Sequence, residues 1–98
     1  MNKDILNNYK NRSEIIKALA HPARLFMIDF LSTGEKCVCE FVKKLELDQS
    51  TVSKHLVLLK NAGLVEYEKR GLNVFYKLKC NCILDVFACI ESVNKSKK

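Results

Sequence analysis

Five cysteines carry the most reactive chemistry of this 98-residue sequence, and four of them form two Cys-x-Cys pairs. The pairs are Cys37 with Cys39 and Cys80 with Cys82, while Cys89 stands alone in an apolar stretch. In a reducing compartment, cysteines in so small a chain serve more often as metal ligands or redox-active thiols than as structural disulfides. The pairs therefore predict thiol chemistry, and Cys89 is expected to be a packed core residue.

A second candidate site is the stretch STVSKHLVLLKNAGLV, residues 50 to 65, which mixes polar and apolar residues at helical spacing. Val52, Leu56 and Leu59 predict a buried face, which leaves hydroxyls, a lysine and a histidine on the outer face. Short side chains in the first turns of such a helix allow close approach to bases and phosphates in the major groove of DNA. The candidate DNA contacts on this helix are Gln49, Ser50, Thr51, Ser53, Lys54 and His55.

Apolar spacing also predicts the elements that precede these sites. Residues 3 to 10 and 14 to 19 are expected to form two short helices. A third helix begins near Pro22, because proline suits a first helical turn, and it ends before Gly34. Its expected core contacts are Leu25, Ile28 and Leu31.

The segment around Cys37 and Cys39 and the polar stretch that follows it predict two helices joined by a tight turn. The segment CVCEFVKKL, residues 37 to 45, has apolar residues on one face and lysines on the other. Asp48 is a good N-cap for the next helix, and Gly63 supplies its left-handed stop. Only about three residues separate the two helices, which is typical of a helix-turn-helix.

From residue 64 the apolar period changes to two, and the segment KRGLN turns the chain between two alternating runs. This pattern predicts a β-hairpin with a basic tip, on which Lys69, Arg70 and Asn73 are candidate contacts to the DNA backbone or the minor groove. The segment ILDVFACIESV, residues 83 to 93, is apolar on more than one face and predicts a last helix that a partner subunit covers. The terminal NKSKK is expected to be disordered.

The order of these elements predicts a mainly α fold with one β-hairpin, a homodimeric winged helix-turn-helix. We expect one DNA-binding domain over residues 1 to 98, with dimerisation helices at both ends. A net charge of +6 suits double-stranded DNA as partner. Each feature alone has a plainer interpretation: the polar helix face can be simply solvated, and Gly71 with its basic neighbours can serve only the turn and solubility.

No apolar run approaches the roughly 20 residues that span a bilayer. The N-terminal segment MNKDILNNYKNR also lacks the apolar centre of a secretory signal. The sequence therefore predicts a cytoplasmic protein that makes no contact with membranes.

Four segments closely resemble the ArsR/SmtB family of metal- and metalloid-responsive repressors, and the resemblance covers nearly the whole chain. KALAHPARLFMIDFL is similar to the family's second and third helices, CVCEF to its metal-binding box, STVSKHLVLLKNAGLV to its recognition helix and YEKRGLNVFYKL to its wing. The resemblance implies a homodimer that binds an operator palindrome, represses when empty and leaves the DNA when an inducer binds. No cofactor is expected to be required for folding.

The box cysteines are ligands in the family's arsenic and cadmium sensors, so the resemblance assigns the inducer site to Cys37 and Cys39. The inducer is expected to be As(III) or another thiophilic metal ion. Two thiols two residues apart at a helix start can converge on one ion, and the helix terminus is expected to favour their thiolate forms. As the plainer alternative, both are small buried hydrophobes.

The sequence departs from the family at two places. Val42 stands where a third cysteine often follows the box, and the N-terminal arm contains no cysteine. Cys80 and Cys82 lie near the first ligands of the dimer-interface site in zinc sensors, but Val93 and Ser96 stand near that site's remaining ligand positions. These two cysteines can complete a metalloid site, form a second soft-metal site or act as a redox pair.

Two other functions compete with a metal-responsive repressor. A repressor of the same fold can respond to thiol oxidation instead of metal coordination. A small thiol-disulfide protein or metal carrier is the alternative from a different class, but it has no need for a recognition helix and a basic wing. His21 and His55 have no evident nucleophile partner, and the isolated glycines form no phosphate loop. We therefore expect a protein that is not an enzyme.

Overall fold

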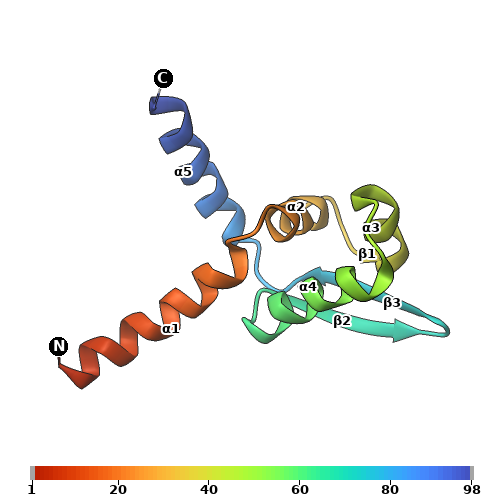
Figure 1. The fold of residues 1–98 in the computed structure, drawn as a ribbon, viewed down its shortest axis with the longest axis horizontal. Coiled ribbons are helices and arrows are strands. Elements are labelled where there is room, and N and C mark those ends of the chain that lie inside the picture. The colour runs from red at the N-terminus through yellow and green to blue at the C-terminus, as the bar shows by residue number, and fades with distance from the viewer. Residues whose placement is uncertain (1, 98) are drawn as a thin grey trace.

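The computed structural model describes residues 2 to 97, which form five helices and one three-stranded antiparallel sheet. The elements are α1 (Lys3–Leu19), α2 (Pro22–Leu31), β1 (Lys36–Cys37), α3 (Val38–Leu45), α4 (Gln49–Asn61), β2 (Val65–Arg70), β3 (Asn73–Leu78) and α5 (Ile83–Ser96). Figure 1 shows a body of α2, α3, α4 and the sheet, with the β2–β3 hairpin extending to one side. Helices α1 and α5 project from the other side. This arrangement is a winged helix-turn-helix, as predicted.

Helix α1 is continuous, whereas the sequence predicted two short helices in its place. No proline or glycine interrupts residues 11 to 13, and the Ser13 hydroxyl donates to the Lys10 carbonyl at 2.8 Å within the helix. The side chain of Asn2 caps its start by accepting from the Asp4 amide at 2.7 Å. The break in apolar spacing therefore marks a polar turn of one helix and not a boundary.

Helix α2 begins at Pro22 as predicted, and His21 caps it by accepting from the Ala23 amide at 3.0 Å through Nδ1. Ile28 and Leu31 are buried, but the expectation for Leu25 is wrong because that side chain is 37% exposed. The buried stripe is centred on Met27 instead, which lies on the same helix face as Leu31.

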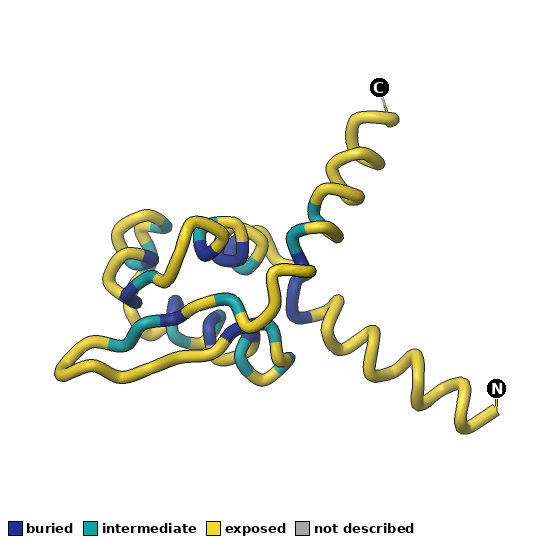
Figure 2. Tube along the Cα trace, turned by 180° about the vertical axis from the view of Figure 1, so that it is seen from behind, coloured by how far each residue is buried: buried dark blue, intermediate teal, exposed yellow. Residues whose placement is uncertain are grey.

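The core lies between α2, α3, α4 and the sheet, where the buried segments of Figure 2 gather. Phe41 of α3 is fully buried and meets Phe30 edge to face, with ring centroids 5.4 Å apart. The other fully buried large side chains are Met27, Ile28, Val52, Leu56, Leu59 and Val65. The three apolar residues predicted to bury the inner face of α4 are thus confirmed.

The turn between α3 and α4 contains three residues, as the spacing predicted. Glu46 takes the left-handed conformation, with φ of 54°, and its amide donates to the Val42 carbonyl at 2.9 Å. Asp48 occupies the N-cap position of α4. Gly63 stops that helix with φ of 83°, a conformation that glycine adopts without steric cost.

The wing contains one strand more than the sequence predicted. Strands β2 and β3 pair from Val65 with Leu78 to Arg70 with Asn73, which is the predicted hairpin. The two-residue β1 pairs with the other edge of β3, with Cys37 opposite Phe75. Two residues are too short to show an alternating pattern, so this strand left no signal in the sequence.

Helix α5 buries only its start against the body. Ile83 is buried and Leu84 and Phe87 pack on the core, while the rest of the helix is exposed in this chain. The expectation that Cys89 is packed is therefore wrong here. The helix also continues through Ser96, so the expected disorder from residue 94 is wrong for residues 94 to 96. Within residues 2 to 97, no helix is both long and apolar enough to cross a membrane.

Replacing Phe41 by alanine tests the core. The substitution removes a fully buried ring and is expected to lower the free energy of unfolding by about 3–5 kcal/mol. Urea denaturation at one fixed protein concentration measures this loss. Leu72→Ala at the wholly exposed wing tip is the control and should change stability by less than about 0.5 kcal/mol. A Phe41→Ala loss no larger than that of the control would contradict the described core.

Candidate DNA interface and thiol site

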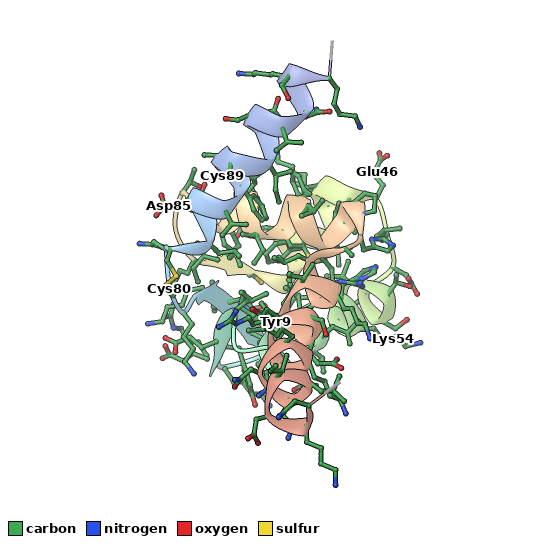
Figure 3. The ribbon with its side chains drawn as sticks, turned by 90° about the vertical axis from the view of Figure 1, so that its left-hand side faces the viewer. Tyr9, Glu46, Lys54, Cys80, Asp85 and Cys89 are labelled. Atoms are coloured by element: carbon green, nitrogen blue, oxygen red, sulfur yellow. A yellow bond between two sulfur atoms is a disulfide. The ribbon has the colours of Figure 1, made fainter. Side chains whose placement is uncertain are left out.

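The first turns of α4 present three exposed side chains, Gln49, Ser50 and Lys54, and two half-buried ones, Thr51 and Ser53. Figure 3 shows Lys54 projecting away from the body. All five lie in the half of the helix that a helix-turn-helix protein inserts into the major groove. Their positions fit the predicted contacts, with Lys54 as the only lysine or arginine among residues 49 to 55.

The hydroxyls of Ser50 and Thr51 already have a partner within the protein. Ser50 donates to the Asp48 carboxylate at 2.8 Å. Hydrogen bonds from the Thr51 and Ser50 side chains hold the pKa of Asp48 below its usual value, so the carboxylate stays charged at the helix N-terminus. These two hydroxyls therefore stabilise the start of α4 in the free protein.

His55 is turned toward α2 and away from the exposed face of α4. Its Nδ1 lies 2.9 Å from Nη1 of Arg24, and its ring centroid lies 4.5 Å from that of His21. Burial, followed by the charges of His21 and Arg24, lowers the pKa of His55. The imidazole is thus held neutral, and its Nδ1 accepts a hydrogen bond from the guanidinium.

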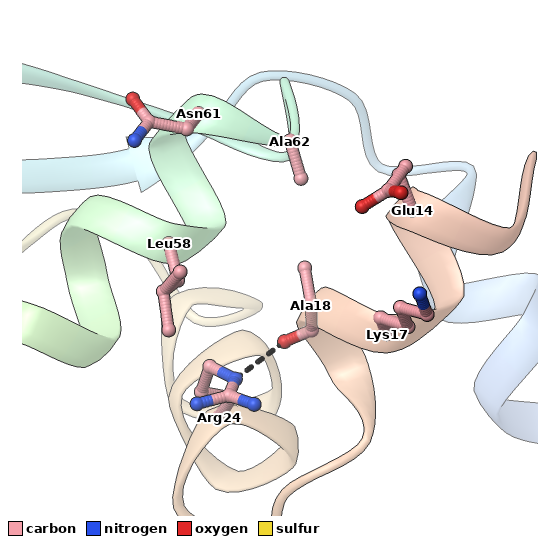
Figure 4. Close-up of a pocket in the computed structure, with 7 residues that line it drawn as sticks. All are labelled: Glu14, Lys17, Ala18, Arg24, Leu58, Asn61 and Ala62. Carbon is pink, nitrogen blue, oxygen red and sulfur yellow. Dashed lines mark hydrogen bonds between the residues drawn. The ribbon is translucent and has the colours of Figure 1, made fainter. Parts of the chain in front are cut away.

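Arg24 joins three helices, a role that sequence reasoning missed. Besides His55 of α4, it contacts the end of α1, where its Nε donates to the Ala18 carbonyl at 2.6 Å (Figure 4). The side chain borders a shallow pocket of about 240 Å³ between α1, α2 and α4. Arg24 thereby fixes α4 relative to α1 and α2. The sequence signal was the arginine two residues after the helix-starting proline.

The wing carries two basic residues with different surroundings. Lys69 is exposed and, among the described residues, belongs to no ion pair. Arg70 forms two contacts with Glu35, at 2.5 and 3.0 Å, and one with Glu68 at 3.0 Å. These contacts lower the pKa of both carboxyls and raise that of the guanidinium. The charge of Arg70 is therefore already offset, whereas that of Lys69 is not.

Cys37 caps α3 with its side chain. Its Sγ accepts from the Cys39 amide at 3.4 Å, and its own amide donates to the Glu40 carboxylate at 2.7 Å. This reciprocal arrangement is a capping box, a motif in which serine or threonine usually stands at the cap. Cys37 is 7% exposed and Cys39 is exposed, with the two sulfurs 2.6 Å apart. The thiols therefore converge on one point at the helix start.

The expectation that the helix start favours both thiolates is wrong for Cys39. Its hydrogen bond with Cys37 raises the pKa of Cys39 above the usual value for a thiol, and burial and the Glu40 carboxylate add to this effect. The hydrogen bond with Cys37 and burial thus outweigh the helix terminus. Cys39 keeps its proton at neutral pH.

The two thiols open into a cleft of about 380 Å³ that α3, the start of α4 and β3 share. We call this the thiol cleft; it is lined by Cys37, Cys39, Gln49, Ser53 and Asn73, together with apolar side chains of α3 and β3 and with Leu72. The Cys37 thiol lies 4.0 Å from the Asn73 side-chain oxygen of the wing. The two thiols, the start of α4 and the first residues of β3 thus line one cavity.

Cys80 and Cys82 are not brought to this cleft. They are joined by a disulfide in the segment between β3 and α5, where Figure 3 shows the sulfur–sulfur bond beside the Cys80 label. Cys37 pairs with Phe75 of β3, whereas Cys80 lies beyond the end of that strand, and neither Cys80 nor Cys82 lines the cleft. Within residues 2 to 97, no three His, Cys, Asp or Glu side chains are grouped to hold a metal ion.

The winged fold with its helix-turn-helix defines a DNA-binding transcriptional regulator. Residues 21–67 match the family model described as "Bacterial regulatory protein, arsR family". The chain is 38% identical over 89 residues to the arsenical resistance operon repressor of Staphylococcus xylosus, covering 91% of this chain and 86% of that one. The protein therefore belongs to the arsR family of bacterial regulatory proteins, whose members are transcriptional regulators and not enzymes.

Two solved structures have the same fold. The homodimeric winged helix-turn-helix DNA-binding domain of a Mycobacterium bovis protein, determined by solution NMR, matches with a TM-score of 0.83 at 26% identity, covering 99% of this chain and 90% of that one. Reduced HlyU from Vibrio cholerae matches with a TM-score of 0.74 at 33% identity and covers 96% of each chain.

The raised pKa of Cys39 predicts slow alkylation. At neutral pH, iodoacetamide is expected to modify Cys39 more slowly than the cysteine of an unstructured reference peptide, and the rate should rise with pH as the thiolate forms. Tandem mass spectrometry of tryptic peptides measures the rate of Cys39. Glu40→Gln removes one negative neighbour and should speed the modification of Cys39 at neutral pH. Labelling of Cys39 as fast as that of the reference cysteine would contradict the described surroundings.

Proposed function

We propose that the protein is a homodimeric repressor that binds operator DNA and releases it when a thiophilic metal or metalloid, As(III) in the first place, binds Cys37 and Cys39. The observation that carries the proposal is the thiol cleft, in which the two sulfurs share one cavity with α4 and the wing. A ligand held by the thiols would occupy space beside two DNA-contacting elements. The arsenical resistance operon repressor named above is a relative of matching length.

Operator binding would place the start of α4 in the major groove and the wing along the backbone. The proposed contacts are Gln49, Ser50, Thr51, Ser53, Lys54, His55, Lys69, Arg70 and Asn73. Their surroundings support different roles: Lys54 and Lys69 are exposed and would meet phosphates, whereas His55 would act mainly by holding α4 against Arg24. Arg70 would have to exchange its carboxylate partners for a phosphate.

Dimerisation would use the two projecting helices. Apolar side chains of both are exposed in one chain, namely Ile5, Leu6, Tyr9, Ile15, Ile16, Val86, Ile90 and Val93. A monomeric protein rarely leaves so much apolar surface uncovered. Pairing of α1 and α5 across a two-fold axis would cover it and place the two recognition helices about 34 Å apart, one turn of DNA.

The inducer would act through Cys37, which has three structural roles. It caps α3, belongs to β1 beside Phe75 of the wing strand, and lies 4.0 Å from the Asn73 side chain. A metalloid bound to both sulfurs would take the Cys37 sulfur away from the Cys39 amide and from Asn73. The wing and the start of α3 would then shift together, and the DNA-competent dimer would lose population.

A thiol redox switch is the second candidate function. The Cys37 and Cys39 sulfurs are 2.6 Å apart, so oxidation to a disulfide would move the same helix start. HlyU, a structural relative, is named in its reduced form. This alternative keeps the fold and the operator but replaces coordination by oxidation.

The wing predicts unequal effects of its two basic residues. Lys69→Ala should weaken operator binding and reduce the slope of log affinity against log salt concentration by about one. Arg70→Ala should cost less, because Glu35 and Glu68 already offset that charge. Glu35→Gln should leave Arg70 paired with Glu68 alone, which makes Arg70 more available to phosphate and the salt slope steeper. Fluorescence anisotropy over a salt series measures all three variants.

Lys3→Ala, at the far end of α1, is the control for the change in net charge and should leave the slope unaltered. A larger loss of affinity for Arg70→Ala than for Lys69→Ala would contradict this assignment of the wing.

The ligand assignment is tested by titrating arsenite into the protein–operator complex under anaerobic, reducing conditions. Wild type should lose operator affinity several-fold to about 100-fold. The Cys37→Ser/Cys39→Ser variant should stay bound, and its fold should persist because serine is itself a good N-cap. Cys89→Ser is the matched control and should respond like wild type.

Three outcomes would change the proposal. A normal response of the Cys37→Ser/Cys39→Ser variant would exclude these ligands. A lost response in a Cys80→Ser/Cys82→Ser variant would add those residues to the ligand set, as the sequence left open. Wild type that ignores arsenite but leaves the operator on mild oxidation would replace coordination by the redox switch.

A further inference from the structure

We propose that Cys80 and Cys82 form a reversible dithiol–disulfide site that exchanges with low-molecular-weight disulfides and sets how α5 leaves the body. The site lies outside the thiol cleft and is separate from the inducer ligands proposed above. Its effect on operator binding rests on the proposed function, because α5 is the proposed dimerisation arm. Its chemistry does not.

The two cysteines have the backbone spacing and the access that such a site needs. Their sulfurs are joined across a single residue, Asn81, and their Cα atoms lie 5.4 Å apart, within the usual range for a disulfide. Both residues are exposed. An exposed disulfide is open to attack by a thiolate from solution, and such disulfides are typically the exchangeable ones.

The pair lies in the segment that connects the end of β3 with α5, and both ends of this segment are held by the body. On one side, the Lys79 amide donates to the Leu64 carbonyl at 3.0 Å, which ties the end of β3 to the start of β2. On the other side, Ile83 is buried in the core as the first residue of α5. The disulfide ring therefore spans the whole connection from the wing to α5.

The ring also supplies hydrogen-bond acceptors for the start of α5. The Leu84 amide donates to the Asn81 carbonyl at 3.0 Å, and the Asp85 amide donates to the Cys82 carbonyl at 3.1 Å. Cys82 is the N-cap residue but makes no side-chain cap bond to the helix. The ring conformation thus takes the place of a side-chain cap, and opening it frees the backbone dihedrals that hold these carbonyls in position.

The exchange is balanced with a disulfide such as oxidised glutathione as oxidant. One cysteine thiolate attacks the glutathione disulfide, forms a mixed disulfide and releases one glutathione thiolate. The second cysteine then attacks the mixed disulfide, closes the Cys80–Cys82 bond and releases the second glutathione. The pair loses two electrons and two protons, which the two glutathione thiols carry, and excess glutathione reverses both steps.

The chemical test uses the full chain with Cys37→Ser, Cys39→Ser and Cys89→Ser, so that only this pair can react. The protein is equilibrated in glutathione buffers of increasing oxidation, quenched by alkylation and weighed by mass spectrometry. We expect both thiols to disappear together, with loss of two hydrogens and no retained glutathione. A further Cys82→Ser change in the same background should retain one glutathione as a mixed disulfide.

The same result is expected in wild type, because cleavage after Lys36, Lys43 and Lys79 separates the two pairs into different tryptic peptides. A pair that stays reduced in every buffer, or that stops at stable mixed disulfides, would overturn the proposal. Formation of a bond from Cys80 or Cys82 to Cys89 in wild type would overturn it as well.

The proposed control of α5 by the disulfide is tested by comparing the oxidised and reduced forms in hydrogen exchange and in operator affinity. The amides of Leu84 and Asp85 should exchange more slowly with the ring closed, and operator affinity should differ at least about five-fold between the forms. Equal exchange and equal affinity with the ring demonstrably closed would overturn the control of α5. Failure of both forms to bind any operator would instead overturn the proposed function, while the thiol count would still stand.

Discussion

The burial of Cys37 at the junction of β1 and α3 is the constraint on which the arrangement of the site depends. Its backbone pairs with Phe75 of the wing strand, its amide donates to Glu40, and its sulfur accepts from the Cys39 amide. A serine would also cap the helix. Only a thiol adds an affinity for soft ions at the same point, so the residue that holds wing and helix together can also respond to a ligand.

Hydrogen bonds behind the proposed DNA-binding surface hold its elements in place. Arg24 connects the Ala18 carbonyl of α1 with His55 of α4. Because the imidazole is neutral, the contact forms without repulsion between two positive charges. Protonation of His55 would place a second cation beside the guanidinium and remove its acceptor. The side chain of Arg70 on the wing is likewise held, by ion pairs with Glu35 and Glu68. Of the basic residues at the proposed DNA surface, Arg70 therefore has structural partners in the free protein, whereas Lys54 and Lys69 remain exposed.

Sequence reasoning predicted most of the fold because Val52, Leu56 and Leu59, and the hairpin strands, follow strict apolar periods. The predictions were wrong or incomplete where contacts between distant parts of the chain determine the structure. The two-residue β1 is defined only by pairing with β3. The break that the sequence predicted within α1 does not exist, because that helix runs without interruption from Lys3 to Leu19. The local position of Cys39 at a helix start predicted a lowered pKa, but Cys37 and Glu40 reverse the effect. The partners of His55 and Arg70 are distant in sequence and could not be predicted from local patterns.

In the proposed mechanism, Cys37 couples the thiol cleft to the operator-binding surface. Coupling between two ligands is reciprocal, so an inducer that weakens operator binding must itself bind more weakly to the operator complex. The most direct measurement is the affinity of As(III) for the free dimer and for the dimer saturated with operator, each by isothermal titration calorimetry. As(III) is expected to bind the operator complex about 5- to 150-fold more weakly than the free dimer. Equal affinity of As(III) for the two forms would contradict this coupling.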